Sequence, residues 1–164
     1  MRRDKSLIPL SHQHQHALAL CVRIDRAQPI PPKNLALWLE EIERDFAQEF
    51  ENHFSAEESV LFPAARQFPE MIPLVDELIS DHAGLRECFS WAGAGTMSLE
   101  ALSDFVRQLS VHIRKEERQL FERLQQLLTA EQLKDLGAQL ESVLEVAERA
   151  CSLPSETTRL KRRN

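Results

Sequence analysis

Two stretches of the chain repeat the same pattern of histidine and glutamate. Residues 53–62 read HFSAEESVLF and residues 112–121 read HIRKEERQLF, so both follow the pattern H-x-x-x-E-E-x-x-L-F. Residues four apart on a helix lie on one face, one turn above the other. Each copy therefore places a histidine and a glutamate together on the side that carries its apolar residues. A buried imidazole beside a buried carboxylate, twice in one chain, predicts a metal site.

Two further histidines lie on apolar stripes of their own. His14 shares a helical stripe with Leu18 and Cys21, and His82 shares one with Leu78. In chain order, the polar residues on these stripes form one unit used twice: a helix with a lone histidine, followed by a helix with H-x-x-x-E. A polar residue where a periodic pattern calls for an apolar one marks a place where function is expected.

The elements that must position these residues are helices. The chain has only 4 Gly and no Tyr in 164 residues, and no strand-like alternation persists, so the predicted class is all-α. Helices are expected over about residues 11–26, 35–67 and 73–91, from Ser98 onward, and over about 130–151. Four antiparallel helices with short connections form an up-down-up-down four-helix bundle.

The chain is expected to form one domain. Residues 1–128 are assigned to the bundle with its metal site, and residues 129–152 to an additional C-terminal helix that packs on it. Residues 153–164 are expected to be a basic tail. The C-terminal helix starts with a capping-box pattern at Thr129-x-x-Gln132 and carries no histidine, so no part in the chemistry is expected of it.

The candidate ligands are four histidines and two glutamates: His14, His53, Glu57, His82, His112 and Glu116. Structural zinc sites favour four ligands, often with cysteine, and calcium or magnesium sites favour oxygen ligands. A mixed nitrogen and oxygen set with two carboxylates that can bridge suits two first-row ions, iron or manganese. The sequence therefore predicts an oxo-bridged pair of iron ions, with manganese or zinc as substitutes. Such a pair leaves a position for dioxygen, another small diatomic molecule or peroxide.

Composition excludes several partners and favours one compartment. The formal charge of −6 argues against nucleic-acid binding, and no apolar run approaches the roughly 18 residues of a membrane span. Three cysteines without a C-x-x-C spacing fit free thiols in a reducing compartment, and no signal peptide opens the chain. We therefore expect a cytoplasmic protein that binds neither nucleic acid nor membranes.

Features outside the stripes leave alternatives open. His12 and His16 are four residues apart and could bind a metal opportunistically, although two solvent-facing imidazoles are the favoured interpretation. Glu58 and Glu117 recur in the repeat but face a different direction from the preceding glutamate, so solvation is favoured over a supporting role. Pro63 predicts a kink near the end of the second helix.

Taken together, the motifs resemble those of the hemerythrin-like (HHE cation-binding) domain family. The resemblance covers about residues 7–125 and is carried by PLSxxHxxAL at 9–18, HxxxEExxLFP at 53–63, DH at 81–82 and HxxxEExxLF at 112–121. It implies a four-helix bundle in which Glu57 and Glu116 bridge two iron ions. The remaining iron ligands that it implies are the four histidines, His14, His53, His82 and His112.

One position departs from the oxygen-carrying branch of that family. Those proteins place a further histidine one turn after the third-helix ligand, where this chain has Arg86. The expectation therefore moves from reversible oxygen carriage toward binding or sensing of dioxygen or a related molecule, or toward iron handling.

Two alternatives to this function stay open. One is a di-iron enzyme for peroxide chemistry or repair of damaged iron–sulfur centres, disfavoured because related repair proteins often carry an N-terminal cysteine-bearing segment that this chain lacks before His14. The other is a metal-stabilised bundle that binds a protein partner, or a homodimer formed through the C-terminal helix.

Overall fold

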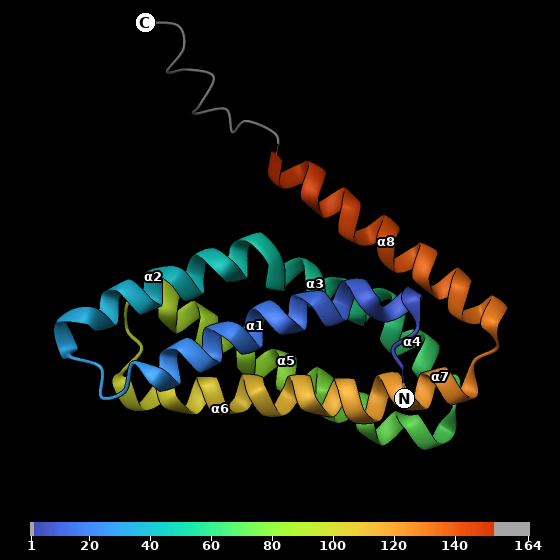
Figure 1. The fold of residues 1–164 in the computed structure, drawn as a ribbon, viewed down its shortest axis with the longest axis horizontal. Coiled ribbons are helices and arrows are strands. Elements are labelled where there is room, and N and C mark those ends of the chain that lie inside the picture. Colours follow the sequence, from blue (N-terminus) through green and yellow to red (C-terminus); the bar gives the residue numbers. More distant parts are fainter. Residues whose placement is uncertain (1, 153–164) are drawn as a thin grey trace, which may run out of the picture.

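The computed structural model describes residues 2–152, with side chains described as far as Glu145. The described chain is helical and contains no strand, which confirms the all-α class (Figure 1). The expected basic tail at residues 153–164 and the side chain of Cys151 lie outside the described residues. Cys21 and Cys88 are buried free thiols, as the sequence predicts.

The helices pack side by side as a bundle, with α1 against α6, α2 against α5, and α5 against α6 (Figure 1). In chain order the bundle helices are α1 (Ile8–Arg26), α2 (Leu35–Asp45), α3 (Glu51–Ala56), α4 (Phe62–Ala65), α5 (Ile72–Gly93), α6 (Leu99–Lys115) and α7 (Phe121–Leu127). Short 3-10 turns precede three of them: η1 (Lys5–Leu7), η2 (Pro32–Asn34) and η5 (Pro69–Met71). A last helix, α8 (Ala130–Ser152), crosses the outside of this bundle.

Two of the three helix starts expected from capping residues have the predicted capping hydrogen bonds. The Ser98 hydroxyl accepts a hydrogen bond from the N–H of Ala101 at 3.1 Å, which caps α6. At the start of α8 the capping box is complete: the N–H of Gln132 donates to the hydroxyl of Thr129 at 3.2 Å, and the N–H of Thr129 donates to the Gln132 side chain at 2.9 Å. Asn34 precedes α2 as expected, but its side chain makes no capping hydrogen bond.

The second and fourth helical segments are not continuous α-helices. Three π-helical turns interrupt them: η3 (Phe46–Phe50) and η4 (Glu57–Leu61) lie between α2 and α4, and η6 (Glu116–Leu120) lies between α6 and α7. In η4 the N–H of Phe62 donates to the carbonyl of Glu57, and in η6 the N–H of Phe121 donates to the carbonyl of Glu116. The uninterrupted helix expected over residues 35–67 is therefore wrong in detail.

Two of these π turns, η4 and η6, lie within the repeated motif and do not depend on proline. Pro63 lies two residues after the end of η4, but the equivalent position after η6 is Glu122, and η6 has the same wide turn. Because the turn recurs without the proline, it belongs to H-x-x-x-E-E-x-x-L-F itself. Single π turns inside α-helices are frequent at functional sites.

The apolar core consists of two hydrophobic clusters. The first cluster contains residues of α1, α2, η3, α3, α5 and α6, among them Ile24, Ile42, Leu85 and Phe105. The second cluster is formed by η1, η4, α4, α5, α7 and α8 and includes Leu7, Leu78, Leu124, Leu136 and Leu140. Helix α8 covers the second cluster with its buried leucines. The division of the chain at residue 128 stays a prediction.

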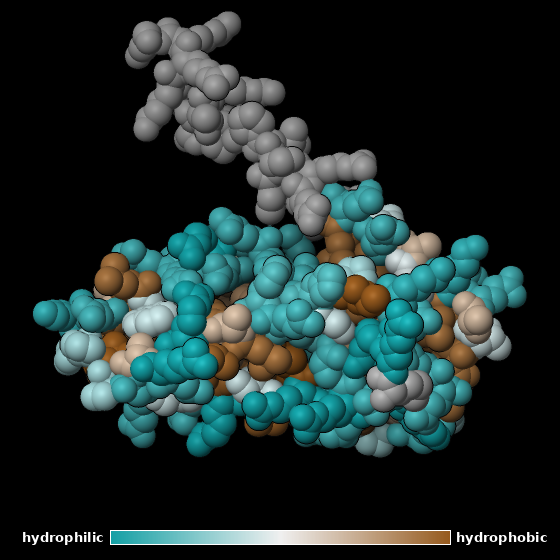
Figure 2. Space-filling model, viewed as in Figure 1, coloured by the Kyte–Doolittle hydropathy of each residue, from teal (hydrophilic) through white to brown (hydrophobic). Residues whose placement is uncertain are grey.

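The outer surface is largely polar. The face seen in Figure 2 is mostly hydrophilic, with hydrophobic side chains in scattered patches, as is usual for a folded protein surface. None of the described helices combines the length and the apolar character needed to cross a membrane.

Candidate metal centre

The six residues singled out by the sequence are buried together inside the bundle. The structure brings together the lone histidines of α1 and α5, the histidines of α3 and α6, and the glutamates that begin η4 and η6: His14, His82, His53, His112, Glu57 and Glu116. They lie between the two hydrophobic clusters, because the ring of His82 contacts Phe54 of the first cluster and Phe62 of the second. Their role as metal ligands stays a prediction, but their convergence is a finding.

The six residues form two groups that share both glutamates. The first group is His14, His53, Glu57 and Glu116, and the second group is His82, His112, Glu57 and Glu116. Within each group, one nitrogen or oxygen atom from every residue lies within 4.8 Å of the others. Each group therefore offers two imidazole nitrogens and two carboxylate oxygens to one small volume.

In the first group the two imidazoles face each other. Nε2 of His14 lies 2.9 Å from Nε2 of His53. Nε2 of His14 also lies 3.1 Å from a carboxylate oxygen of Glu116, and Nε2 of His53 lies 3.2 Å from Oε1 of Glu57. Two nitrogens at this separation must share a proton or a cation.

The second group lies around the other oxygen of Glu57, but its two imidazoles make no hydrogen bond to each other. Nε2 of His82 lies 3.3 Å from Oε2 of Glu57, and Nε2 of His112 lies 3.3 Å from Oε2 of Glu116. The two oxygens of Glu57 thus face different groups. Such a carboxylate is placed to bridge two ions.

Buried polar atoms without partners test whether this donor set fits a metal. All four carboxylate oxygens of Glu57 and Glu116 are buried and accept no hydrogen bond, and Nε2 of His82 and of His112 likewise has no hydrogen-bond partner. A buried acceptor without a donor is costly, and buried polar groups in native proteins are nearly always satisfied. A cation in each group satisfies these lone pairs at once, so the residues fit a pair of metal ions.

Without metal, protons take the place of the cations. Burial disfavours a charged imidazole, but the carboxylates of Glu116 and Glu117 outweigh it and raise the pKa of His14 from 6.5 to about 9. Burial is likewise outweighed for His112, whose pKa is raised to about 10 by Glu116 and Asp81. Metal binding must displace these protons.

The carboxylates show the complementary shift. Burial and the neighbouring Glu116 favour protonation of Glu57, but the imidazoles of His53 and His82 prevail and lower its pKa to about 2. The pKa of Glu116 is also lowered well below its ordinary value, against its burial, chiefly by His112 and His14. Both candidate bridging groups are therefore ionised at neutral pH.

Each repeat supplies a second carboxylate, which contacts Nδ1 of a histidine on the side of the ring that faces away from the cluster. Nδ1 of His14 lies 2.8 Å from Oε1 of Glu117, and Nδ1 of His82 lies 2.8 Å from Oε1 of Glu58. A carboxylate can only accept, so Nδ1 carries a proton and Nε2 is the nitrogen that faces the interior of the cluster. The favoured interpretation of Glu58 and Glu117 as merely solvated is therefore wrong.

The residues before the lone histidines lie beside Nδ1 of the other two rings, but only Gln13 makes a hydrogen bond there. Oε1 of Gln13 lies 2.8 Å from Nδ1 of His53, and Oδ2 of Asp81 lies 3.5 Å from Nδ1 of His112, which is too long for a good hydrogen bond. Sequence reasoning did not find Gln13. The signal that could have found it is positional, because Gln13 and Asp81 occupy the same place in the two halves of the repeat.

Arg86 does not enter the cluster. Its Nη1 donates to Oε1 of Glu58 at 2.6 Å, and its guanidinium lies 5.2 Å from the centre of the Phe54 ring. Arg86 therefore fixes the Glu58 carboxylate that contacts His82, and it does not take the place of a metal ligand. Arg3 does the same on the other side, where it pairs with the side chain of Glu117.

The remaining histidines lie away from the cluster. His12 and His16 are exposed, in line with the favoured interpretation of two solvent-facing imidazoles. Nδ1 of His16 lies 3.1 Å from Oε1 of Glu49, and the His16 side chain is 70% exposed. Neither residue belongs to a metal-capable group within the part of the chain that the structure describes.

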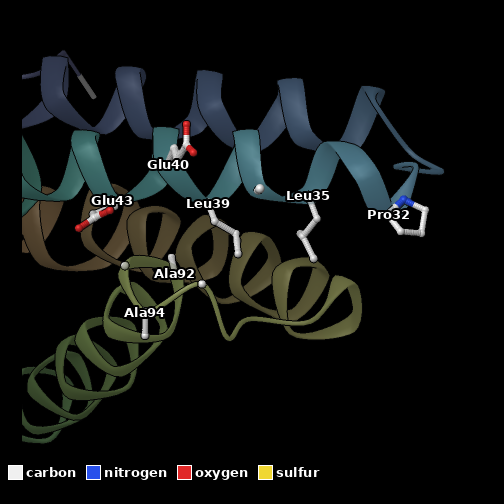
Figure 3. A pocket seen from close by; sticks show the side chains of 10 residues that line it. Pro32, Leu35, Leu39, Glu40, Glu43, Ala92 and Ala94 are labelled. Atoms are coloured by element: carbon white, nitrogen blue, oxygen red, sulfur yellow. The ribbon is translucent and has the colours of Figure 1, made fainter.

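A surface hollow lies away from the cluster, between α2 and the end of α5. Leu35 and Leu39 of α2 point toward the C-terminal end of α5, near Ala92 and Ala94, with Glu43 beside them (Figure 3). This hollow shares no residue with the six of the buried cluster. Its apolar floor offers nothing to the metal site.

Fold and site together define a helical-bundle protein with a buried histidine and glutamate site suited to metal cations. Comparison with protein families gives the same answer. The family described as the hemerythrin HHE cation-binding domain matches residues 9–124, most of the chain, and the protein belongs to this family. The resemblance stated from the motifs is confirmed. No curated protein matches the chain, and no solved structure does.

Proposed function

We propose that the six clustered residues bind two first-row metal ions, and that iron is the metal in the cell. His14 and His53 hold one ion, His82 and His112 hold the other, and Glu57 and Glu116 bridge the two. The observation that carries this proposal is the set of four buried carboxylate oxygens that lack hydrogen-bond donors while facing four imidazoles. The proposal includes the up-down-up-down order of the four bundle segments, which brings one unit of the repeat against the other.

On this proposal the protein binds or senses dioxygen or a related small molecule, or handles iron. When bound, two iron ions supply one-electron redox steps and coordination positions for a small diatomic molecule or peroxide. The chain itself provides a dry, fixed surrounding. Phe54 stacks on His82 with ring centres 4.0 Å apart, and Phe121 stacks on His14 at 5.5 Å. These rings exclude water and fix the imidazole planes, while Glu58 and Glu117 fix the protonated nitrogens.

Metal analysis with absorption spectroscopy tests this function. Protein produced with iron should contain two irons per chain, with near-ultraviolet bands of an oxo-bridged pair that bleach on reduction. Zinc alone, or no metal, in a folded helical protein would contradict the redox role and leave a structural bundle.

A matched pair of variants separates site from surface. Glu57→Leu combined with Glu116→Leu keeps the side chains large but removes both bridges, so we expect a helical protein without bound metal. His16→Ala removes an exposed imidazole of the same helix as His14 and should retain two irons. Equal metal content in both variants would place the ions elsewhere.

A further inference from the structure

The two groups have matching ligands, so a difference between the two ions must come from the residues behind the histidines. Each group offers two imidazoles and shares the same two glutamates. Contacts behind metal-binding histidines fix the ring and raise its basicity, and removing one typically lowers metal affinity about 10–100-fold. These outer contacts therefore set how tightly each ion is held.

Three of the four histidines have an ionised carboxylate behind them that is tied to a basic side chain. The carboxylate pairs are Glu117 with Arg3 behind His14, Glu58 with Arg86 behind His82, and Asp81 with Lys115 behind His112. Two of these basic side chains form a further ion pair each: Arg86 also contacts Glu51, and Lys115 also contacts Glu77 at 2.7 Å. Glu117 and Glu58 lie 2.8 Å from the Nδ1 atoms of His14 and His82, whereas Asp81 lies 3.5 Å from Nδ1 of His112 and acts on that ring through its charge.

His53 has a different support. Its Nδ1 is held by the amide oxygen of Gln13 at 2.8 Å. An uncharged amide makes a weaker hydrogen bond to an imidazole N–H than an ionised carboxylate makes. His53 is therefore the one histidine of the four that has no ionised carboxylate behind it.

Gln13 also lines a hollow at the surface. The hollow measures about 240 Å³ and is bounded by Gln13, Gln48, Glu49, Asn52 and Leu144, from α1, η3, α3 and α8. One water molecule takes up about 30 Å³, so a hydrated ion can be accommodated. Its walls present amide and carboxylate oxygens, which hydrated divalent cations prefer, and Glu49 attracts positive charge.

We propose that the ion of the first group is the exchangeable one of the pair, and that divalent cations reach and leave it through the hollow over Gln13. The inference rests on the proposed two-ion function. The ring of His53 opens toward the hollow when its bond to Gln13 breaks, while both imidazoles that hold the ion of the second group have ionised carboxylates behind them.

Release of Co²⁺ to a chelator tests the inference. Protein loaded with two Co²⁺ per chain is mixed with excess EDTA, and the visible absorption of bound Co²⁺ is followed. We expect two phases of equal amplitude. Gln13→Ala should accelerate the fast phase about tenfold and leave the slow phase unchanged. Gln13→Glu, which keeps the side-chain size and supplies a carboxylate, should slow the fast phase.

Asp81→Asn provides the matched control, because Asp81 holds the same place in the second half of the repeat. It should change the slow phase and leave the fast phase as it is. Glu49→Gln should slow Co²⁺ uptake without changing the final stoichiometry. Loss of both ions in one phase, or equal responses of both phases to Gln13→Ala, would overturn the inference while the two-ion site stands. A wild-type stoichiometry below two would overturn the proposed function and this inference with it.

Discussion

Between the two hydrophobic clusters lies a polar layer, which consists of the six clustered histidines and glutamates. The clusters and the polar layer are built from the same helices but contribute in opposite ways to stability. Each fully buried leucine or phenylalanine of the clusters contributes about 1.5–3 kcal/mol. The polar layer instead buries four carboxylate oxygens without hydrogen-bond donors, which opposes folding unless a cation compensates. The clusters on both sides therefore hold a layer that would not form alone, and the proposed metal binding belongs to this layer.

The largest expected effect comes from removing one bridging carboxylate. Glu116 faces His14 at 3.1 Å and His112 at 3.3 Å, so Glu116→Ala leaves both groups incomplete. We expect the metal-loaded state to lose about 3–5 kcal/mol of unfolding free energy, as when one partner of a buried charged set is removed. Bound metal should fall below two ions per chain, as measured by urea unfolding and metal analysis.

Phe105→Ala is the counterpart in the first cluster. Phe105 is fully buried, and truncation of such a side chain costs about 3–5 kcal/mol as well. Here the metal content should stay at two ions per chain. If both variants lost metal equally, the polar layer and the clusters would be one unit rather than two.

Changing the pH should alter the contribution of the polar layer to the free energy of unfolding and leave the contribution of the clusters unchanged. In the metal-free protein the pKa of His14 is raised to about 9 and that of His112 to about 10, so their stabilisation is complete below 6.5 and is lost as the pH rises through 9 and 10. The pKa of Glu57 and that of Glu117 are lowered to about 2, so their stabilisation is present above 4.5 and is lost as the pH falls through 2. Metal-free protein should be most stable between about pH 4.5 and 6.5.

Metal affinity should change in the opposite direction over the alkaline range. Binding must expel protons from His14 and His112, so the apparent affinity should increase from pH 6.5 toward 9. Urea unfolding of metal-free protein and Co²⁺ titrations across this range measure both effects. Metal-free stability that is flat from pH 6.5 to 10 would show that these imidazoles are uncharged in the folded protein.

Sequence periodicity was sufficient to locate the six clustered residues, because each occupies a helical stripe where an apolar side chain is expected. Capping residues located the starts of α6 and α8, since Ser98 and Thr129 accept hydrogen bonds from N–H groups three residues further on. The π turns were missed, because a pattern of apolar residues at spacings of three and four does not distinguish a wide turn from a regular one. Gln13 was missed because its role depends on His53, 40 residues away, across a packed helix pair.

The smallest expected effect concerns α8, which touches the second cluster and carries none of the six clustered residues. Thr129→Ala removes the hydroxyl that caps the helix at 3.2 Å and should lower the unfolding free energy by about 1 kcal/mol. Thr129→Ser retains the hydroxyl and should keep most of that stability. In both variants the metal content should stay at two ions per chain, because the buried Leu136 and Leu140 belong to the second cluster. Loss of metal from Thr129→Ala without loss of stability would show that α8 supports the polar layer directly.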